Sequence, residues 1–395
     1  MIPRFRQSFN GSFTLEKYQN FLKRMERRCR TAIHFRICET PCFFPASLMD
    51  QMAATGEVLI RQLLDNEDYR RASDVAVPPE FHTPGEERNP SFVSVDFGLV
   101  REGGEPQPRL VELQAFPTLY AYQAALAQEY KDAYNLPKNL KIFFGDLDFE
   151  KYHRLLRRAI LGDRAPENVV LLEIDPYDQK TLPDFLLTEE LCGIQPVNIR
   201  DVVKQGDRLH YKNNGKLVSI HRIYNRVIFD ELVRKKIEPP FDFREPLDVE
   251  WAGHPNWYFR ISKFSIPYLR HESVPRTWFL HELKDIPVDR ENYLLKPLYS
   301  FAGGGIIFAP TDEQLAAIPA SERHNYILQQ RLQFSPVIET PHGPTQAEVR
   351  IMYIWLPNEA LRPVMGLVRM GRGKMMGVDH NRNLEWVGAS AALIA

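Results

Sequence analysis

The chain has 395 residues, of which 44% are hydrophobic and 26% are charged, and its formal net charge is −1. This composition is ordinary for a globular protein with room for two or three domains, and its balanced charge argues against a nucleic-acid partner held by bulk electrostatics. The chain has no apolar run of membrane-spanning length, no signal-like N-terminal segment and only four cysteines. We therefore expect a reduced, cytoplasmic protein that makes no contact with a membrane.

Helical patterns dominate the first ninety residues. Residues 15–30 place apolar side chains at helical spacing and end in a basic run, which complements a helix dipole. Residues 45–64 are predicted to form a second helix, and a proline- and charge-rich connection covers 73–90. We expect residues 1–90 to form an N-terminal helical segment.

An antiparallel hairpin is predicted next, with strands over 92–100 and 109–116 around a glycine- and proline-containing turn. A helix is expected over 118–134. The pattern then alternates between strands and helices from about residue 140, with an apolar strand at 168–174 and a helix at 182–192 that Gly193 ends. This alternation predicts a small open α/β domain over 139–250.

Carboxylate and amide side chains gather on the predicted hairpin. Asp96 lies on the first strand, and Glu112 and Gln114 lie two residues apart on the second, so their side chains share a face. Hard oxygen ligands of this kind suit Mg²⁺. When the hairpin is considered alone, a solvent-facing strand edge with incidental acidic residues is the commoner explanation.

A lysine-proline pair followed by glycines marks the C-terminal part, residues 251–395. An apolar run ends in Lys296-Pro297, and Gly303, Gly304 and Gly305 precede a second apolar run. Glycines let backbone N–H groups close over an anion, and the lysine adds a positive charge. The segment is not a P-loop, because no Gly-Lys-Ser/Thr opens a helix. It predicts either a loop over nucleotide phosphates or a glycine-rich hairpin with an incidental lysine.

Other residues of the chain are also candidates for binding the same nucleotide. Lys263 is placed to neutralise phosphate oxygens, and Gln329 and Gln330 end a predicted strand, where an amide and the adjacent backbone suit an adenine edge. Arg350 and Arg369 lie on later predicted strands, and Arg369 belongs to a basic segment suited to an anion. Each residue alone is more often a solvated surface charge, but their joint occurrence after the glycine loop favours a site.

Together these segments resemble the ATP-grasp superfamily, in particular the circularly permuted branch that includes glutathionylspermidine synthase. The metal-binding strands precede the lysine-proline segment here, whereas they follow it in unpermuted members. The resemblance rests on 293–297 with 303–306, on 326–330, on 257–263, on 108–120 and on 95–97.

The resemblance implies a mixed α/β (α+β) fold, a circularly permuted ATP-grasp with a pre-ATP-grasp-like α/β domain. Residues 91–138 would then supply the metal-binding hairpin and helix, and 251–395 the nucleotide-binding part. It also implies an ATP-dependent ligase that joins a small carboxylate to an amine, a peptide or polyamine among the candidates, through an acyl phosphate. Magnesium would be bound by Asp96, Glu112 and Gln114. ATP would be bound by Lys263, Lys296, the glycine loop, Gln329 and Gln330.

Two departures from the family pattern bear on activity. Gln114 stands where the synthase has asparagine, and Ser94 stands where it has an arginine thought to steady the reacting carboxylate. Arg350 or Arg369 would have to supply that cation as the catalytic residue. Otherwise the chain binds nucleotide without ligating anything, or it is a phosphotransferase that uses the same grasp.

Overall fold

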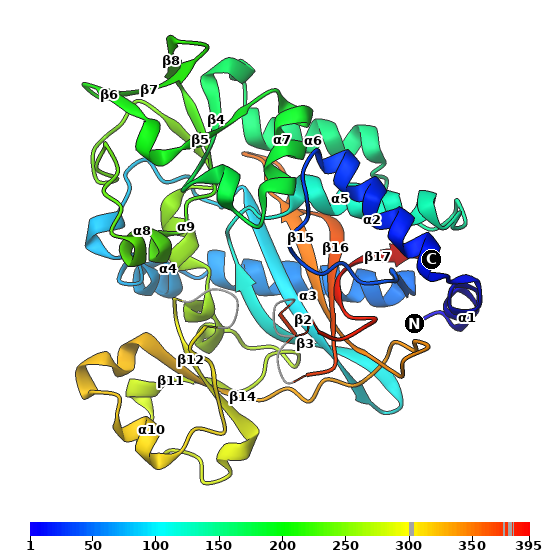
Figure 1. Ribbon diagram of the computed structural model, residues 1–395. Coiled ribbons are helices and arrows are strands. Elements are labelled where there is room, and N and C mark those ends of the chain that lie inside the picture. The colour runs from blue at the N-terminus through cyan, green and yellow to red at the C-terminus, as the bar shows by residue number, and fades with distance from the viewer. Residues whose placement is uncertain (300–303, 374–375, 378–380, 382) are drawn as a thin grey trace.

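The computed structural model describes residues 1–299, 304–373, 376–377, 381 and 383–395 (Figure 1). A large six-stranded sheet, in the order β1-β17-β16-β15-β2-β3, forms the centre of the molecule. Neighbouring strands are antiparallel except β1 and β17, which are parallel. The strands are β1 (Cys42–Phe44), β2 (Phe92–Glu102), β3 (Glu105–Gln114), β15 (Gln346–Ile354), β16 (Arg362–Gly371) and β17 (Gly388–Ile394).

Side-chain alternation gives the large sheet two different faces. Val93, Val95 and Phe97 of β2 point to one face, where they join the apolar side of α3 (Ala46–Leu64) in a buried core. The opposite face is covered by helices that share a second core with it. These helices are α2 (Leu15–Cys29), α5 (Tyr120–Ala133), α6 (Phe149–Leu161) and α7 (Leu182–Cys192), with α1 (Pro3–Ser12) beside them.

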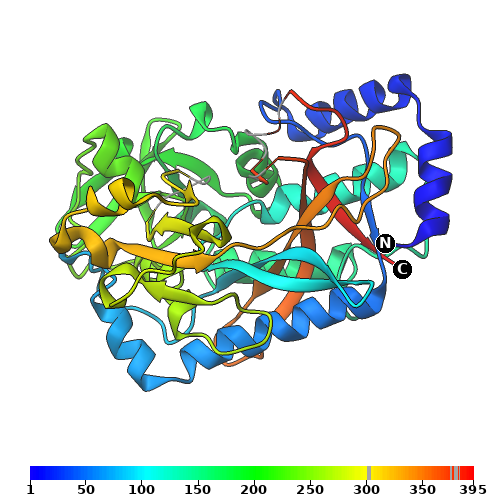
Figure 2. The same ribbon diagram turned by 90° about the horizontal axis from the view of Figure 1, so that it is seen from below.

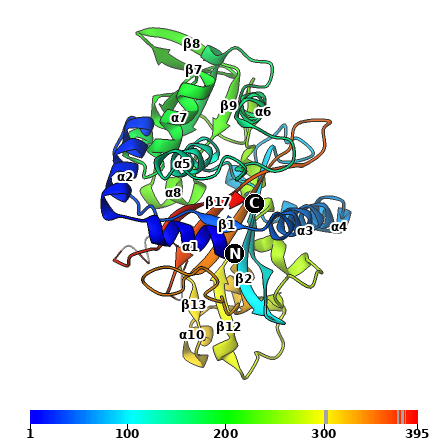
Figure 3. The ribbon, with the colours of Figure 1, turned by 90° about the vertical axis from the view of Figure 1, so that its right-hand side faces the viewer.

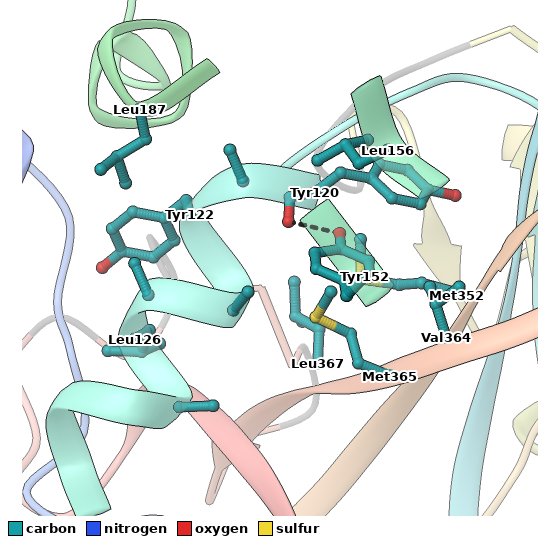
Figure 4. Packing of buried hydrophobic residues seen from close by; sticks show 14 of the residues in the cluster. Tyr120, Tyr122, Leu126, Tyr152, Leu156, Leu187, Met352, Val364, Met365 and Leu367 are labelled. Carbon is teal, nitrogen blue, oxygen red and sulfur yellow. Dashed lines mark hydrogen bonds between the residues drawn. The ribbon is translucent and has the colours of Figure 1, made fainter. Parts of the chain in front are cut away.

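The helices cover only one end of this second face. Figure 4 shows Tyr120 and Leu156 beside Met352, Val364, Met365 and Leu367 of the sheet, and the Tyr152 hydroxyl donates to the Tyr120 carbonyl at 2.7 Å. Alternation along β15 then places Arg350 and Glu348 on the face of Met352. The apolar core therefore continues directly into a charged end of the same face.

A parallel α/β unit adjoins the large sheet, as the sequence pattern predicts. Its four strands lie in the order β10-β9-β4-β5 and are all parallel. A three-stranded antiparallel sheet, β6-β7-β8, extends from it. The elements are β4 (Val169–Glu173), β5 (Gln195–Asn198), β6 (Val203–Gln205), β7 (Arg208–Asn213), β8 (Lys216–Ile220), β9 (Arg222–Asn225), β10 (Glu250–Ala252) and α8 (Phe229–Lys235).

A small antiparallel sheet lies opposite the α/β unit, at the bottom of Figure 3. Its strand order is β11-β14-β12-β13, and α10 (Asp312–Ala316) begins with a capping box between Thr311 and Gln314. Leu295, Leu315 and Leu328 form its own apolar core. The strands are β11 (Thr277–Phe279), β12 (Tyr293–Pro297), β13 (Ile307–Phe308) and β14 (Tyr326–Gln330).

Several local predictions were wrong. The apolar pattern of residues 257–271 predicts one helix, but the helix α9 (Pro255–Arg260) is short, and Ser262 caps a separate 3-10 turn that contains Pro267. Pro267 lacks the N–H that a longer helix needs. The predicted strand over 141–144 forms only isolated bridges. The elements α1, α4 (Glu67–Asp74), β1 and β17 were not predicted.

The large sheet draws strands from distant parts of the chain. β1 comes from the first predicted segment, β2 and β3 from the second, and β15 to β17 from the last. The division into four domains stays a prediction. Both termini lie close together, as Figure 2 shows: the Ile2 N–H donates to Phe43 at 3.1 Å and the Ala395 N–H to Phe44 at 3.0 Å. Among the described helices, none combines the length and apolar character needed to cross a membrane.

Candidate functional site

The charged end of the large sheet brings together residues from three adjacent strands. Asp96 on β2 lies directly opposite Glu112 on β3, and Arg350 on β15 lies opposite Asp96 on the other side. Directly opposed residues in a sheet project from the same face. A bulge after Asp96 shifts the β2–β3 register, so the pairing of Asp96 with Glu112 is local to this end of the hairpin.

A buried ion network joins these strands to β16. Arg350 donates through Nε and Nη2 to the two oxygens of Asp96 at 2.6 and 2.7 Å, a bidentate pair. Arg369 bridges Asp96 and Glu348. The exposed fractions are 1% for Asp96, 5% for Arg350 and 7% for Glu348, so these three residues are shielded from bulk water, while the Arg369 side chain is partly exposed.

Burial and ion pairing set the pKa values of this network in different directions. Burial favours the neutral form of Asp96, but the charges of Arg350 and Arg369 outweigh it and hold the pKa of Asp96 below its ordinary value. For Glu348, burial dominates and raises the pKa despite Arg369. Burial alone would lower the pKa of Arg369, yet Glu348 and Asp96 raise it, so Arg369 stays charged.

Gln114 also turns toward Arg350. With its amide oriented to satisfy both partners, its oxygen accepts from Arg350 Nη2 at 2.6 Å and from Nη1 at 2.5 Å. Its neighbour across the hairpin is Ser94, which is buried. Each of the three guanidinium nitrogens of Arg350 thus donates to Asp96 or Gln114.

The predicted magnesium ligands do not suit a metal ion in this arrangement. Both oxygens of Asp96 and the amide oxygen of Gln114 bond to arginine, which leaves Glu112 as the one predicted ligand without such a bond. Within the described part of the chain, no group of three or more His, Cys, Asp or Glu side chains is placed to hold a metal. The magnesium assignment stays a prediction that this donor set does not favour.

The small sheet presents Lys296 to this network. On β12 and β14, Leu295 and Leu328 oppose each other and point into the small core, while Lys296 opposes Ile327, which packs in the core of the large sheet. Alternation therefore turns Lys296 toward the large sheet. The side chain is 4% exposed, so the sequence-predicted lysine is buried between the two sheets.

Burial lowers the pKa of Lys296 to about 8, while the charges of Glu112 and Glu348 raise it and that of Lys263 lowers it. Those influences show that the two lysines and the two carboxylates lie within electrostatic range of one another. The bonds and ion pairs of the described residues include none from the Lys296 ammonium. Lys263, at the first position of the 3-10 turn after Ser262, is buried as well.

The two predicted glutamines behave differently. Gln329 shares the Lys296 face of the small sheet, is 2% exposed, and its Nε2 has no hydrogen-bond partner among the described residues. Gln330 is exposed, lies on the opposite face, and its N–H donates to Arg276 at 2.8 Å. The structure brings Gln329 to the site and leaves the Gln330 side chain outside it.

The predicted glycine loop is described only in part. Gly303 lies outside the described residues. Gly304 is exposed, and Gly305 has a φ of 72°, where a Cβ would lie 3.0 Å from the Pro297 ring. A glycine therefore suits position 305 for its backbone conformation, next to the strand that carries Lys296.

Three residues at the site have no role in the sequence-based prediction. Glu348 forms the far end of the ion network. Gly98, opposite Glu348, has no room for a side chain because a Cβ would lie 1.8 Å from the ring of Phe334. A glycine inside a strand is a known signal of such close approach, whereas Phe334 lies in an irregular segment that no pattern marks.

Comparisons with known proteins place the fold. No protein-family model matches the chain, and no curated protein matches it. Among solved structures, the chain is similar to a glutathione synthetase-like effector from Globodera pallida, determined in its apo form. The TM-score is 0.58 at 11% identity, over 96% of this chain and 97% of that one. The chain therefore shares a mixed α/β fold with that effector over nearly the whole length of both chains.

Proposed function

We propose that the chain binds ATP between its small sheet and the charged end of its large sheet, and that it is an ATP-dependent carboxylate–amine ligase of the permuted ATP-grasp type. The observation that carries this proposal is the buried Lys296 ammonium, which the small sheet turns toward the large one and which has no ion-pair partner among the described residues. A buried, unpaired cation is costly unless an anion completes it. The phosphates of a nucleotide are such an anion.

The other residues take roles that follow from their positions. Lys263 adds a second positive charge near Lys296, and Gln329 offers a buried amide without a partner to the edge of a base. ATP supplies the phosphoryl group that activates a carboxylate for attack by an amine. The chain's own contribution is to position these partners and to exclude water between two sheets.

Arg369 is the better candidate for the cation near the reacting carboxylate. Its side chain is 23% exposed, whereas that of Arg350 is 6% exposed and bonds to Asp96 and Gln114 through all three guanidinium nitrogens. Of the two arginines, Arg369 is therefore the more open to a substrate. If Arg369 contacts the transition state, Arg369→Gln should slow turnover by about 10²–10³-fold, the range for losing one preorganised donor.

The direct test is nucleotide binding by the Lys296→Ala variant. We expect the wild-type chain to bind a fluorescent ATP analogue and the variant to lose about ten- to a hundredfold in affinity, because one charge-assisted contact contributes about 1.5–3 kcal/mol. Lys284→Ala is the matched control, since Lys284 is an exposed lysine near the small sheet. Equal affinities for wild type and Lys296→Ala would contradict the proposed site.

Ligation requires a second assay. ADP formation should appear when a carboxylate and an amine are supplied together, with amino acids, peptides and polyamines as the panel. A nucleotide-binding protein without ligase activity is the second candidate, and one observation favours it: Asp96 is fully engaged by Arg350 and Arg369. Nucleotide binding without ADP formation for any pair would select this second candidate.

A further inference from the structure

The ion network at the charged end of the large sheet carries its own charge compensation. Asp96 and Glu348 are the two acids, Arg350 and Arg369 are the two bases, and each acid is bonded directly to at least one arginine. The charges of these four residues sum to zero. Oδ1 of Asp96 accepts from Arg350, and Oδ2 accepts from both Arg350 and Arg369, so each oxygen already bonds to an arginine.

A divalent cation would have to break this arrangement. It would compete at Asp96 with Arg350, whose side chain is 6% exposed and whose three guanidinium nitrogens donate to Asp96 or Gln114. The displaced guanidinium would remain buried without a counter-charge, which is strongly unfavourable. Two guanidinium groups would also repel the incoming ion at close range.

The basic side chains that repel a divalent cation here would attract an anion. Among the described residues the Lys296 ammonium has no ion-pair partner, and the side chain of Arg369 is 23% exposed. Arginine forms planar, bidentate contacts to phosphate oxygens and keeps its charge at any physiological pH. The charges of Glu112 and Glu348 act on both Lys296 and Arg369, so an anion bound beside these carboxylates lies within electrostatic range of both cations.

From this arrangement we infer that the site binds the polyphosphate of a nucleotide in its metal-free form, with the Arg350–Asp96–Arg369–Glu348 network in the place of a divalent cation. The inference rests on the proposed nucleotide binding. Arg369 contacts the phosphates, and Arg350 is a positioning residue that fixes Asp96, which in turn orients Arg369.

The experiment compares binding of a fluorescent ATP analogue to the full chain in excess EDTA and in excess MgCl₂. We expect the affinity in EDTA to equal or exceed the affinity in MgCl₂, because magnesium screens the phosphates from the basic side chains. Affinity at least about tenfold weaker in EDTA, a readily measured difference, would overturn the inference and leave the proposed nucleotide site standing. Absence of binding in both conditions would overturn both.

The Arg369→Gln variant tests whether the ion network itself, rather than the general positive charge of the site, takes the place of the metal. This variant should lose about tenfold in affinity in EDTA, and MgCl₂ should restore part of the loss, because Glu348 loses its arginine partner and Asp96 keeps only Arg350. Arg71→Gln is the matched control, since Arg71 forms an exposed ion pair with Asp68. Circular dichroism confirms that each variant is folded. If Arg369→Gln and wild type respond to magnesium identically, the network does not take the place of the metal.

Discussion

At the scale of single residues, burial controls the protonation of Glu173. Glu173, at the end of β4, is 2% exposed, and burial raises its pKa to about 8, against which the charge of Arg226 acts only in part. The folded protein therefore keeps a proton on Glu173 over a range in which the unfolded chain, with an ordinary value of 4.5, has lost it. The contribution of this group to stability is full at low pH and is lost as the pH rises toward 8.

The Glu173→Gln variant should not show this loss of stability at higher pH, because glutamine does not ionise. We expect the variant to gain at least ~1 kcal/mol of unfolding free energy relative to wild type at pH 8 compared with pH 5, because one pKa unit corresponds to about 1.4 kcal/mol. Urea unfolding at both pH values measures the difference. Glu190→Gln, at an exposed glutamate of α7, is the control. A Glu173→Gln effect that does not change with pH would show that Glu173 is ionised in the folded protein.

At the scale of elements, the contact between α3 and the large sheet depends on a helical glycine. A Cβ on Gly56 would lie 2.1 Å from the Tyr353 hydroxyl, which is buried and donates to the Ala53 carbonyl at 2.7 Å. The glycine therefore lets α3 approach β15 closely. Its cost to helix propensity is offset by this packing.

Gly56→Ala should destabilise the protein by about 1–3 kcal/mol through overpacking, although alanine is the better helix former by about 1 kcal/mol. Gly11→Ala is the matched control: Gly11 also lies in a helix, and a Cβ there would meet no atom within 4 Å. We expect Gly11→Ala to be neutral or slightly stabilising in thermal unfolding. Equal effects at both positions would mean that Tyr353 moves aside without loss.

At the scale of the whole molecule, the two chain ends lie close together because both bond to β1. We therefore expect the protein to fold when these ends are joined and the chain is opened elsewhere. A permutant that links Ala395 to Met1 and opens between Gly103 and Gly104 should fold, because both glycines are exposed in the β2–β3 turn and a short added loop costs little entropy. Circular dichroism and the melting temperature should match wild type within a few degrees. A permutant opened between Arg350 and Ile351, inside β15, should not fold. Failure of the first permutant would show that the hairpin turn is needed for folding.

The local elements with strong patterns could be predicted from the sequence. The helix over 149–161 and the strands at 293–297 and 326–330 match the structure in their bounds, because periodicity and turn residues act within one segment. β17 was missed: its run of alanines and serine has no clear period, and its place in the sheet comes from its partners β1 and β16. Similarly, Ser262 and Pro267 set the end of α9 more strongly than the helical pattern around them.

By itself the sequence determined which residues carry charge in which segment, and so it could nominate Asp96, Lys296, Arg350 and Arg369 together. Only the tertiary structure decided what these charges meet. Arg350 reaches Asp96 across 254 residues of sequence, and a shift of one residue in the register of β15 against β2 would turn Arg350 to the apolar face. Pairing between distant strands depends on the packing of both faces of the sheet, which no local pattern contains. That pairing bonds Asp96, a predicted metal ligand, to Arg350. Lys296 faces this ion pair from the small sheet.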